Sequence, residues 1–380
     1  MQIYFVTNIC PHYRVKAFEL IANAYPTRFF FFSDGEREKY WDKKNTTSLG
    51  NFDGQYVKSW RLFTSRFRFI PFLYAHLLFD HYDVLIKCIN GKAPLLLSFL
   101  IAKLRGKPFI LWSGVWYHPK TLIHRISFPL LRWIYLQSHA IVVYGTHVKN
   151  YLTSLGIPSD KIFIAWQTVD NERLGRKIVD TEIMELRKQL GITDEKVVLY
   201  VGRLESQKGI EYLIRAMSLL SSAVKATLVF IGVGSRRNEF EQLLYQLGIP
   251  SFRFLDHIPN NNLPSYYRLA DVLVLPSITT KDFREPWGLV VNEAMNQGCP
   301  VIATDAVGAA VGGLLDHGRN GIVVPERSED ELAANLSAVL LNENVRIRLS
   351  SNAKTTIGNW TYERMVSGFR QAIDYVFDHE

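Results

Sequence analysis

An alternation of short apolar runs with helical patterns is the feature that most limits how this chain can fold. The runs in the first half have the length of strands, and the segments between them have the spacing of amphipathic helices. Strands connected through helices form parallel sheets, because each helix returns the chain to the same end of the sheet. We therefore expect a doubly wound α/β domain with strands at residues 3–7, 28–33, 84–89, 109–113 and 140–144, and helices such as 15–24 and 95–104.

The second half of the chain repeats this organisation and indicates a second domain. Apolar runs at residues 197–201, 227–231 and 301–303 each lead into a glycine-containing loop. The chain has 380 residues, 48% of them hydrophobic, which suffices for two cores of ordinary size. Residues 1–168 carry 21 Lys and Arg against 9 Asp and Glu (net +12), whereas the remainder carries 23 against 27 (net −4). This change of sign supports a domain boundary near Val169.

Composition argues against several other classes of protein. The sequence contains no run of the roughly 18 apolar residues that a transmembrane helix requires. Residues 1–6 are typical of a first strand rather than of a cleavable leader, so we expect a cytosolic start. Cys10, Cys88 and Cys299 are odd in number and widely spaced in apolar surroundings. They therefore indicate reduced structural thiols, and neither a disulfide framework nor a zinc site.

Two glutamates lie in a turn-to-helix pattern at residues 281–298. Pro286 suits the first position of a helix, where its missing N–H costs nothing, and Gly288 lets a ligand approach the free N–H groups of the first turn. The pattern predicts an anion site. Because Glu293 lies eight positions after Glu285, a helix would place their carboxylates about 12 Å apart on nearly the same side. That gap fits a nucleotide diphosphate, with a sugar at one end and the ribose at the other.

An ordinary structural role is the alternative for these carboxylates. Glu285 would then be an anion at a helix N-terminus, and Glu293 a solvated helix residue. The sequence around Glu293 argues against this alternative, because apolar residues surround it and a buried-strand pattern follows it. A carboxylate buried there needs hydrogen-bonding partners, which favours a functional role for the pair.

The same stretch resembles the signature of the retaining glycosyltransferases of family four. The matching elements are Glu285, seven residues and Glu293, with Pro-Trp-Gly-Leu between them and Glu-Ala-Met at the end. The resemblance implies a GT-B fold, in which two Rossmann-like doubly wound parallel-sheet domains face a cleft. It also implies a nucleotide-sugar donor in the second domain and no catalytic metal. Glu285 would contact the donor sugar, Glu293 the ribose, and the amides of Gly288 and Leu289 other polar groups of the donor.

A second motif that resembles the family follows the apolar run at residues 197–201. Glycines bracket Arg203 and Lys208 in Gly-Arg-Leu-Glu-Ser-Gln-Lys-Gly. The resemblance implies that both cations grip the donor diphosphate, and solvated surface cations are the alternative. The turn at residues 232–234 is an incomplete dinucleotide fingerprint, because a third glycine and the acidic residue are missing. The resemblance places this turn near the nucleotide and the base against the next loop, which adds Gly232, Gly234, His257 and Ile258 to the expected donor contacts.

The first half resembles the family only in its pattern of elements. Residues 8–14 lack the Gly-Gly loop that the family often places against the donor phosphates. Arg14 therefore either replaces those backbone donors or pairs with a surface carboxylate. Many relatives carry a His at the strand end near residue 113, where this chain has Ser113, with His118 five residues later. A lone His is more often structural, and we keep Arg14, Ser113 and His118 as candidates on the acceptor side.

Residues 57–79 interleave aromatic with basic side chains. Such a stretch suits the interface of an anionic membrane. Alternatively its aromatic residues belong to a core, or it forms a nucleic-acid groove, although no recognised nucleic-acid motif accompanies it. The residues concerned are Trp60, Phe63, Phe67, Phe69, Phe72, Tyr74 and Phe79, with Lys58, Arg61, Arg66 and Arg68.

These inferences combine into the hypothesis of a retaining, metal-independent hexosyltransferase. It would move a hexosyl group from a UDP- or GDP-type nucleotide sugar to a hydroxyl of a lipid-linked, surface-polysaccharide or lipopolysaccharide intermediate, without a further cofactor or nucleic acid. We expect it in the cytoplasm, bound peripherally to the inner face of the membrane. The expected domains are 1–169 for the acceptor, 170–358 for the donor, and a helix in 359–380 that crosses back to the first domain. A nucleotide-sugar epimerase and a non-catalytic nucleotide-sugar-binding protein are the alternatives.

Overall fold

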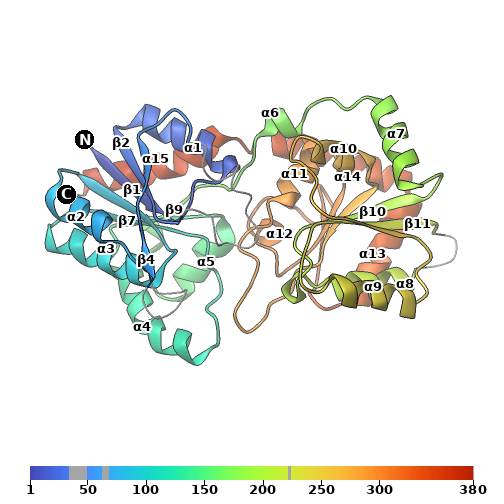
Figure 1. Ribbon diagram of the computed structural model, residues 1–380, viewed down its shortest axis with the longest axis horizontal. Coiled ribbons are helices and arrows are strands. Elements are labelled where there is room, and N and C mark those ends of the chain that lie inside the picture. The colour runs from blue at the N-terminus through green and yellow to red at the C-terminus, as the bar shows by residue number, and fades with distance from the viewer. Residues whose placement is uncertain (34–48, 62–67, 221–223, 380) are drawn as a thin grey trace. The chain divides into compact units, whose positions relative to one another are not determined.

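A computed structural model describes residues 1–33, 49–61, 68–220 and 224–379 (Figure 1). The chain forms two compact units, each built on its own parallel sheet. Unit 1 comprises Met1–Thr168 together with Tyr362–Glu380, and unit 2 comprises Val169–Thr361. The predicted pair of doubly wound α/β folds is confirmed.

The sheet of unit 1 is parallel and has the strand order β3-β2-β1-β6-β7-β8-β9. The chain runs from β1 outward to β2 and β3 and then crosses to β6, so the strand order reverses between β1 and β6. The strands predicted for this half are present with ends shifted by one or two residues, whereas β3 and β9 were not expected. The bounds are β1 (Ile3–Thr7), β2 (Thr27–Phe31), β3 (Gly54–Tyr56), β6 (Val84–Cys88), β7 (Phe109–Ser113), β8 (Ala140–Val143) and β9 (Ile162–Ile164).

Helices cover both faces of this sheet, because each strand sends alternate side chains to opposite sides. In β1, Tyr4 and Val6 pack in the cluster formed with α2 to α5, whereas Ile3 and Phe5 pack with α1 and α15. Since both sets are buried, the strands are mostly apolar, and Lys87 of β6 is a fully buried exception. The helices are α1 (His12–Ala24), α2 (Pro71–Phe79), α3 (Lys92–Leu104), α4 (Leu122–Gln137), α5 (Thr146–Ser154) and α15 (Tyr362–Asp378).

Helix α15 belongs to unit 1 although it follows unit 2 in the sequence. Its buried face includes Phe369, whose ring centre lies 5.8 Å from that of Phe5 and 5.4 Å from that of Trp112. A Cβ added to Gly368 would lie 2.2 Å from the carbonyl oxygen of Ile164, so only glycine permits this approach to β9. The helix is therefore fitted closely to the sheet of unit 1.

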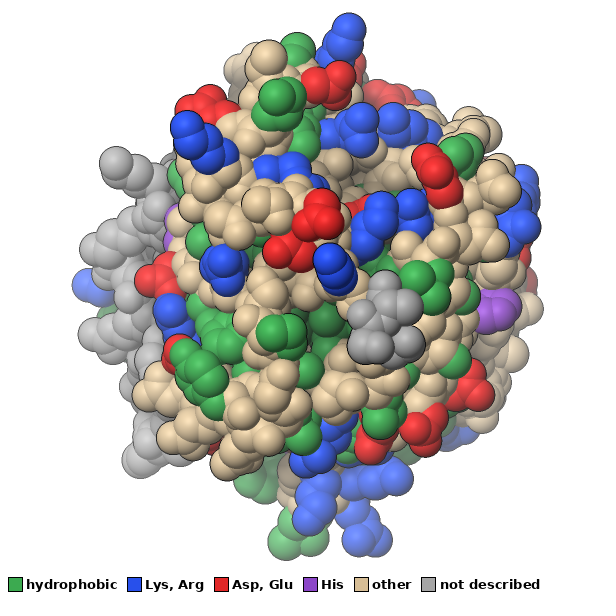
Figure 2. All heavy atoms as spheres, turned by 90° about the vertical axis from the view of Figure 1, so that its right-hand side faces the viewer, with side chains coloured by type: hydrophobic (Ala, Val, Ile, Leu, Met, Phe, Trp, Pro, Cys, Tyr) green, Lys and Arg blue, Asp and Glu red, His purple; other side chains and the backbone are tan. Residues whose placement is uncertain are grey.

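The sheet of unit 2 is also parallel, with the order β12-β11-β10-β13-β14-β15 and a reversal between β10 and β13. Acidic and basic side chains are interspersed on the face of this unit shown in Figure 2. The strands are β10 (Lys196–Val201), β11 (Ala226–Ile231), β12 (Phe252–Leu255), β13 (Val272–Leu275), β14 (Val301–Thr304) and β15 (Ile322–Val324). The helices are α6 (Asn171–Leu174), α7 (Asp180–Leu190), α8 (Ile210–Ser218), α9 (Arg237–Gln246), α10 (Leu263–Leu269), α11 (Val290–Asn296), α12 (Gly308–Val311), α13 (Glu329–Leu341) and α14 (Glu343–Gly358).

The aromatic and basic stretch at residues 57–79 is not one continuous element. It contains the short strands β4 (Trp60–Arg61) and β5 (Arg68–Phe69), which pair antiparallel, and then α2. The core interpretation applies to Tyr74, which is buried, whereas Trp60, Phe72 and Phe79 are exposed. Of the remaining residues in the prediction, Phe63, Arg66 and Phe67 lie outside the described ranges.

We predict that Phe369→Ala destabilises the protein by about 3–5 kcal/mol, because it removes a buried ring and leaves a cavity against Phe5 and Trp112. Phe377 lies on the same helix with its side chain exposed, so Phe377→Ala should change the free energy of unfolding by less than about 0.5 kcal/mol. Denaturant unfolding of both variants measures the difference. Equal effects would show that α15 does not close this core.

Candidate active site

The carboxyl ends of the strands in unit 2 hold the residues singled out in the second half of the sequence. In open α/β sheets, ligands bind outside the carboxyl ends of the strands at the point where the strand order reverses. In unit 2 this point lies between β10 and β13. Arg203 and Lys208 follow β10, whereas Glu285 lies in the segment that follows β13. The fold thus brings both family motifs to one edge of one sheet.

Glycines allow the loops after β10 and β11 to pack backbone against backbone. A Cβ added to Gly232 would lie 2.0 Å from the carbonyl oxygen of Gly202, and one added to Gly234 would lie 2.2 Å from that of Leu204. Glu205 ties the same two loops together, because its carboxylate accepts hydrogen bonds from the backbone N–H of Ser235 at 3.0 Å and from its hydroxyl at 2.8 Å. Glycine is required at 232 and 234 for this packing, independently of any nucleotide.

Lys208 and Glu285 form an ion pair that is largely withdrawn from water. The two side chains are only 12% and 11% exposed, and the Ser277 hydroxyl also donates to Glu285 at 3.3 Å. Lys208 ends a short 3₁₀ turn, and Gly209 follows it with a φ of +62°. A Cβ at Gly209 would lie 2.0 Å from the carbonyl oxygen of Pro276, so glycine lets this turn approach the end of β13. Lys208 and Glu285, two of the three catalytic candidates, are therefore in direct contact.

The third catalytic candidate, Arg203, is partly buried in the same loop. Its carbonyl oxygen accepts a hydrogen bond of 2.8 Å from the hydroxyl of Tyr200. Burial raises the pKa of Tyr200 well above its ordinary value, and the nearby Glu285 adds to the shift. Tyr200 thus remains a neutral donor that fixes the backbone at Arg203. The sequence did not single it out, because an aromatic residue within an apolar run indicates only core.

The helix predicted from Pro286 begins later, at Val290, and the prediction of its start is wrong. Glu285 is extended and pairs with Val307 in an isolated bridge, and Gly288 has a φ of +90°, which is outside the helical region. The backbone N–H of Ala309 donates to the carbonyl of Trp287 at 2.7 Å, which holds this turn against the neighbouring loop. The spacing of about 12 Å assumed a continuous helix. It therefore does not apply to the whole interval between Glu285 and Glu293.

Glu293 lies on α11, where its carboxylate accepts a hydrogen bond of 2.6 Å from the hydroxyl of Tyr267. Burial raises the pKa of Glu293, and the bond from Tyr267 and the charge of Arg173 partly oppose this shift. A solvated helix residue would not show this environment. Tyr267 lies 26 residues before Glu293 in the sequence, so no local pattern identified it as a partner. The sequence indicated only that a buried carboxylate at Glu293 needs hydrogen-bonding partners.

Of the other expected donor contacts, Leu289 directly precedes α11, and His257 and Ile258 follow β12. The start of α11 and the end of β12 both lie at the edge of the sheet that also holds Lys208. His257 is exposed, while Ile258 is partly buried. An ion pair between Arg237 and Asp256 joins α9 to the same loop. Backbone contacts with a planar base are therefore open to this segment.

Arg14 is buried inside unit 1, which excludes the prediction that it pairs with a surface carboxylate. Its guanidinium donates to the side-chain oxygen of Gln167 and lies 5.0 Å from the ring centre of Trp112. It also contacts the sulfur of Met365 on α15 at 3.2 Å. Arg14 borders a cavity of about 180 Å³ at the reversal point of this sheet. The other alternative, that Arg14 donates hydrogen bonds to the phosphates of the nucleotide sugar, stays a prediction.

The structure separates the two other candidates of unit 1. Ser113 is buried at the end of β7, where its hydroxyl lies 3.3 Å from that of Tyr135 and accepts a hydrogen bond of 3.2 Å from the N–H of Val115. His118 lines a different cavity, and its Nε2–H donates to the carbonyl of His124 at 2.8 Å. Ser113 therefore supports the backbone, and only His118 faces open space.

The described residues contain no group of three His, Cys, Asp or Glu side chains placed to hold a metal ion. Within the same ranges, no helix combines the length and apolar character needed to cross a membrane. Cys10, Cys88 and Cys299 are free and buried, and burial raises the pKa of Cys10 to about 12. That thiol is therefore protonated at neutral pH.

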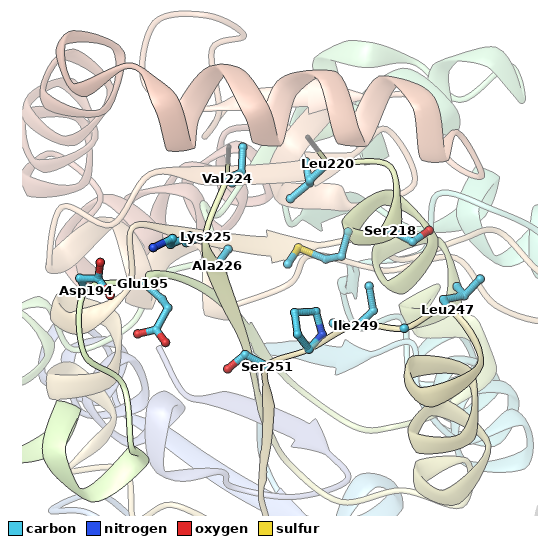
Figure 3. Close-up of a pocket in the computed structure, with 13 residues that line it drawn as sticks. Asp194, Glu195, Ser218, Leu220, Val224, Lys225, Ala226, Leu247, Ile249 and Ser251 are labelled. Atoms are coloured by element: carbon cyan, nitrogen blue, oxygen red, sulfur yellow. The ribbon is translucent and has the colours of Figure 1, made fainter. Parts of the chain in front are cut away.

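Unit 2 also contains a cavity of about 670 Å³ at the opposite edge of its sheet (Figure 3). Its lining includes Glu195, Lys225 and Ser251, which directly precede β10, β11 and β12. These are the amino ends of the strands, where the reversal rule places no ligand. The cavity therefore does not belong to the site built by Lys208 and Glu285.

The two units and the site between β10 and β13 define the GT-B class of sugar-transferring α/β folds. The model of Glycosyltransferase Family 4 matches residues 19–173, and the model of Glycosyl transferases group 1 matches residues 182–356. Together these models account for most of both units, and the chain belongs to the group 1 glycosyltransferases of family 4.

Relatives with curated descriptions match only part of their own length. An uncharacterized glycosyltransferase of Methanocaldococcus jannaschii is 34% identical over 227 residues, which are 58% of this chain and 56% of that protein. The α-D-kanosaminyltransferase of Streptomyces kanamyceticus is 27% identical over 70% of each chain. The match thus spans 56% and 70% of the length of these two relatives.

Among solved structures, HepE of Anabaena in complex with UDP and glucose has a TM-score of 0.76 to this chain. The alignment covers 98% of this chain and 99% of HepE, with 19% sequence identity. A likeness at this identity supports the fold.

We predict that Glu293→Gln is more stable relative to the wild type at neutral pH than at pH 4. The folded state raises the pKa of this carboxyl above its ordinary value of 4.5, chiefly through burial. Ionisation therefore favours the unfolded chain, and the wild type loses stability as pH rises from about 4.5 to the raised value. Glutamine cannot ionise and still accepts the bond from Tyr267.

Denaturant unfolding of both proteins across pH 4–8 measures this difference. The advantage of the variant should grow with pH and then level off. A difference that does not change with pH would mean that Glu293 is fully solvated.

Proposed function

We propose that this protein is a retaining glycosyltransferase that moves a hexosyl group from a nucleotide diphosphate sugar to an acceptor hydroxyl. The observation that carries the proposal is the buried pair of Lys208 and Glu285 at the carboxyl ends of β10 and β13. A largely buried lysine beside glycine-containing loops suits a diphosphate. It stabilises the negative charge of the diphosphate more strongly in this buried site than it would in water. Membership of the glycosyltransferase family supports the same reaction.

The proposed roles follow from the charges of the site. Lys208 and Arg203 stabilise the negative charge that develops on the departing diphosphate. Glu285 fixes the ammonium of Lys208 and orients the donor sugar, while Glu293, fixed by Tyr267, binds the ribose. Because Glu285 holds the ammonium of Lys208 in place, the cation needs little rearrangement when the donor binds.

We propose front-face transfer for the chemical step. The acceptor oxygen forms a bond to the anomeric carbon on the face from which the diphosphate leaves. The bond between that carbon and the phosphate oxygen breaks, and its electron pair stays on the phosphate. The acceptor proton passes to this phosphate oxygen, so the configuration of the sugar is retained.

We infer a uridine nucleotide as the first donor to test, because HepE, which shares the fold over 98% of this chain, binds UDP and glucose. Thermal-shift measurements with uridine, guanosine and adenosine diphosphates distinguish the bases. A larger shift with guanosine diphosphate would replace uridine by guanosine and leave the rest of the proposal intact.

The acceptor that we propose is carried on a lipid-linked or surface-polysaccharide intermediate, with the enzyme bound peripherally to the cytoplasmic face of the membrane. The net charge of +12 on residues 1–168 supports attraction to an anionic surface. An epimerase would convert one nucleotide sugar into another without net release of nucleotide, and a binding protein would not turn the donor over. Nucleotide release that depends on added acceptor therefore separates the three functions.

We predict that Lys208→Ala and Arg203→Ala each lower kcat by roughly 10²–10³-fold, as does the loss of one preorganised donor to the transition state. Lys225→Ala is the matched control, since Lys225 belongs to the opposite edge of the same sheet. It should keep the wild-type rate. Steady-state release of nucleoside diphosphate measures all three, with circular dichroism to verify folding. Wild-type turnover in a folded Lys208→Ala variant would remove the diphosphate role of Lys208.

We predict that donor turnover survives an excess of chelator, because Lys208 and Arg203 supply the positive charge that a metal would otherwise provide. The measurement compares initial rates with and without EDTA after exhaustive dialysis. Loss of activity that added magnesium or manganese restores would refute the metal-independent mechanism.

A further inference from the structure

The middle of unit 1 carries only one sign of charge. Between Asp83 and Asp160 the sequence contains no Asp or Glu. This interval includes α3, β7 and α4 and the loops that join them. An anion therefore meets no carboxylate of this segment on its approach. The basic residues of the interval are Lys87, Lys92, Lys103, Arg105, Lys107, Lys120, Arg125, Arg132 and Lys149. Lys87 is fully buried, and burial lowers its pKa to about 7, so the other eight carry the charge that an anion meets.

Helix α4, which lies at the lower margin of unit 1 in Figure 1, has an exposed apolar stripe. Leu122, Ile123 and Ile126 are 71%, 62% and 72% exposed, and Leu130 and Trp133 continue the stripe. Positions 122, 126, 130 and 133 recur every three or four residues and so share one side of the helix. Only Ile134 and Tyr135 of this helix are fully buried. We call this set of five exposed residues the α4 stripe.

A cavity of about 320 Å³ lies between α3 and α4. Leu95 and Leu96 line it from α3, and Leu131 and Ile134 line it from α4. Leu130 borders the cavity and also belongs to the α4 stripe, so the two apolar surfaces are continuous. The volume is at the lower end of the range for small-molecule sites, which suits a single alkyl chain.

Polar groups collect at one part of the cavity wall, at the carboxyl edge of the sheet. Lys92 opens α3, and Asn90 precedes it in the loop after β6. His118 and His124 come from the loop after β7 and from α4, and the bond from His118 to the carbonyl of His124 fixes their relation. This polar rim places the charge of Lys92 beside a head group whose chain enters the apolar part.

We propose that the face formed by α3 and α4 is a binding site for an anionic lipid. The α4 stripe contacts the bilayer, one alkyl chain enters the cavity, and the anionic head group lies against Lys92 and the two histidines. The exposed cations Lys120 and Arg125 flank the stripe and attract an anionic surface. The proposal rests on the glycosyltransferase function only for the role of this lipid as the acceptor.

Isothermal titration with dodecyl phosphate, kept below its micelle concentration, tests the cavity. The 380-residue protein should bind it at least about tenfold more tightly than ethyl phosphate or dodecyl maltoside, since these lack the chain and the charge respectively. Ser127→Trp fills the cavity and should weaken binding about tenfold or more. Leu104→Trp is the matched control, because Leu104 is an exposed residue of α3 outside both the cavity lining and the α4 stripe, and it should keep wild-type affinity.

Equal affinity of Ser127→Trp and wild type would overturn the cavity assignment, and equal affinity for dodecyl maltoside would overturn the anionic head group. If Ser127→Trp does not fold, Leu96→Trp fills the same space from α3 and serves in its place.

Flotation with vesicles of phosphatidylglycerol and phosphatidylcholine tests the α4 stripe. The wild type should float, and Ile123→Glu with Ile126→Glu should abolish flotation while dodecyl phosphate still binds. Leu341→Glu with Ile347→Glu is the control, because it adds the same charge at exposed apolar residues of unit 2 and should float normally. Flotation of the α4 variant would refute the stripe. Nucleotide binding by the wild type and every variant is measured in parallel. If the wild type does not bind nucleotide, the glycosyltransferase proposal is contradicted, whereas the lipid proposal is not.

Discussion

The buried ion pair between Lys208 and Glu285 sets a requirement that the rest of unit 2 meets. Two charges withdrawn from water are tolerated only if each is matched at short range, since desolvation costs several kcal/mol per ion. The two residues come from loops after different strands, so both loops must be held rigidly. Close backbone approaches at Gly209 and Gly232, which no larger residue permits, hold the neighbouring turns in place. The positions of Lys208 and Glu285 are therefore determined by the close backbone packing of these loops.

The sequence predicted the strands well because parallel strands buried on both faces are written as continuous apolar runs. It missed β3, where Gly54, Gln55 and Tyr56 are all partly exposed and the pattern does not distinguish a strand from a loop. It also misplaced the start of α11, because the favourable pattern at Pro286 is overridden by the positive φ at Gly288. Local preference predicted that a helix exists, whereas its first residue was decided by contacts with the loop at Val307.

The candidate site shows the same division between local and distant information. Motif spacing identified Lys208 and Glu285, but their contact spans 77 positions and became visible only in the fold. Arg14 is the clearest case, because its partners Gln167 and Met365 lie 153 and 351 positions away. No local sequence pattern predicts partners at such distances along the chain. A buried arginine in contact with aromatic rings then looks, in the sequence alone, like a surface cation.

The position of α15 determines the order in which the protein can be built. Residues 362–378 cover a face of unit 1 whose other parts, including Phe5 and Trp112, are synthesised far earlier. Unit 2 is continuous in sequence and can fold as it leaves the ribosome, whereas unit 1 keeps an uncovered apolar surface until α15 emerges. Such surfaces favour aggregation and recruit chaperones. Nascent chains that stop short of residue 362 should therefore be the most dependent on chaperones, although their donor unit is already complete.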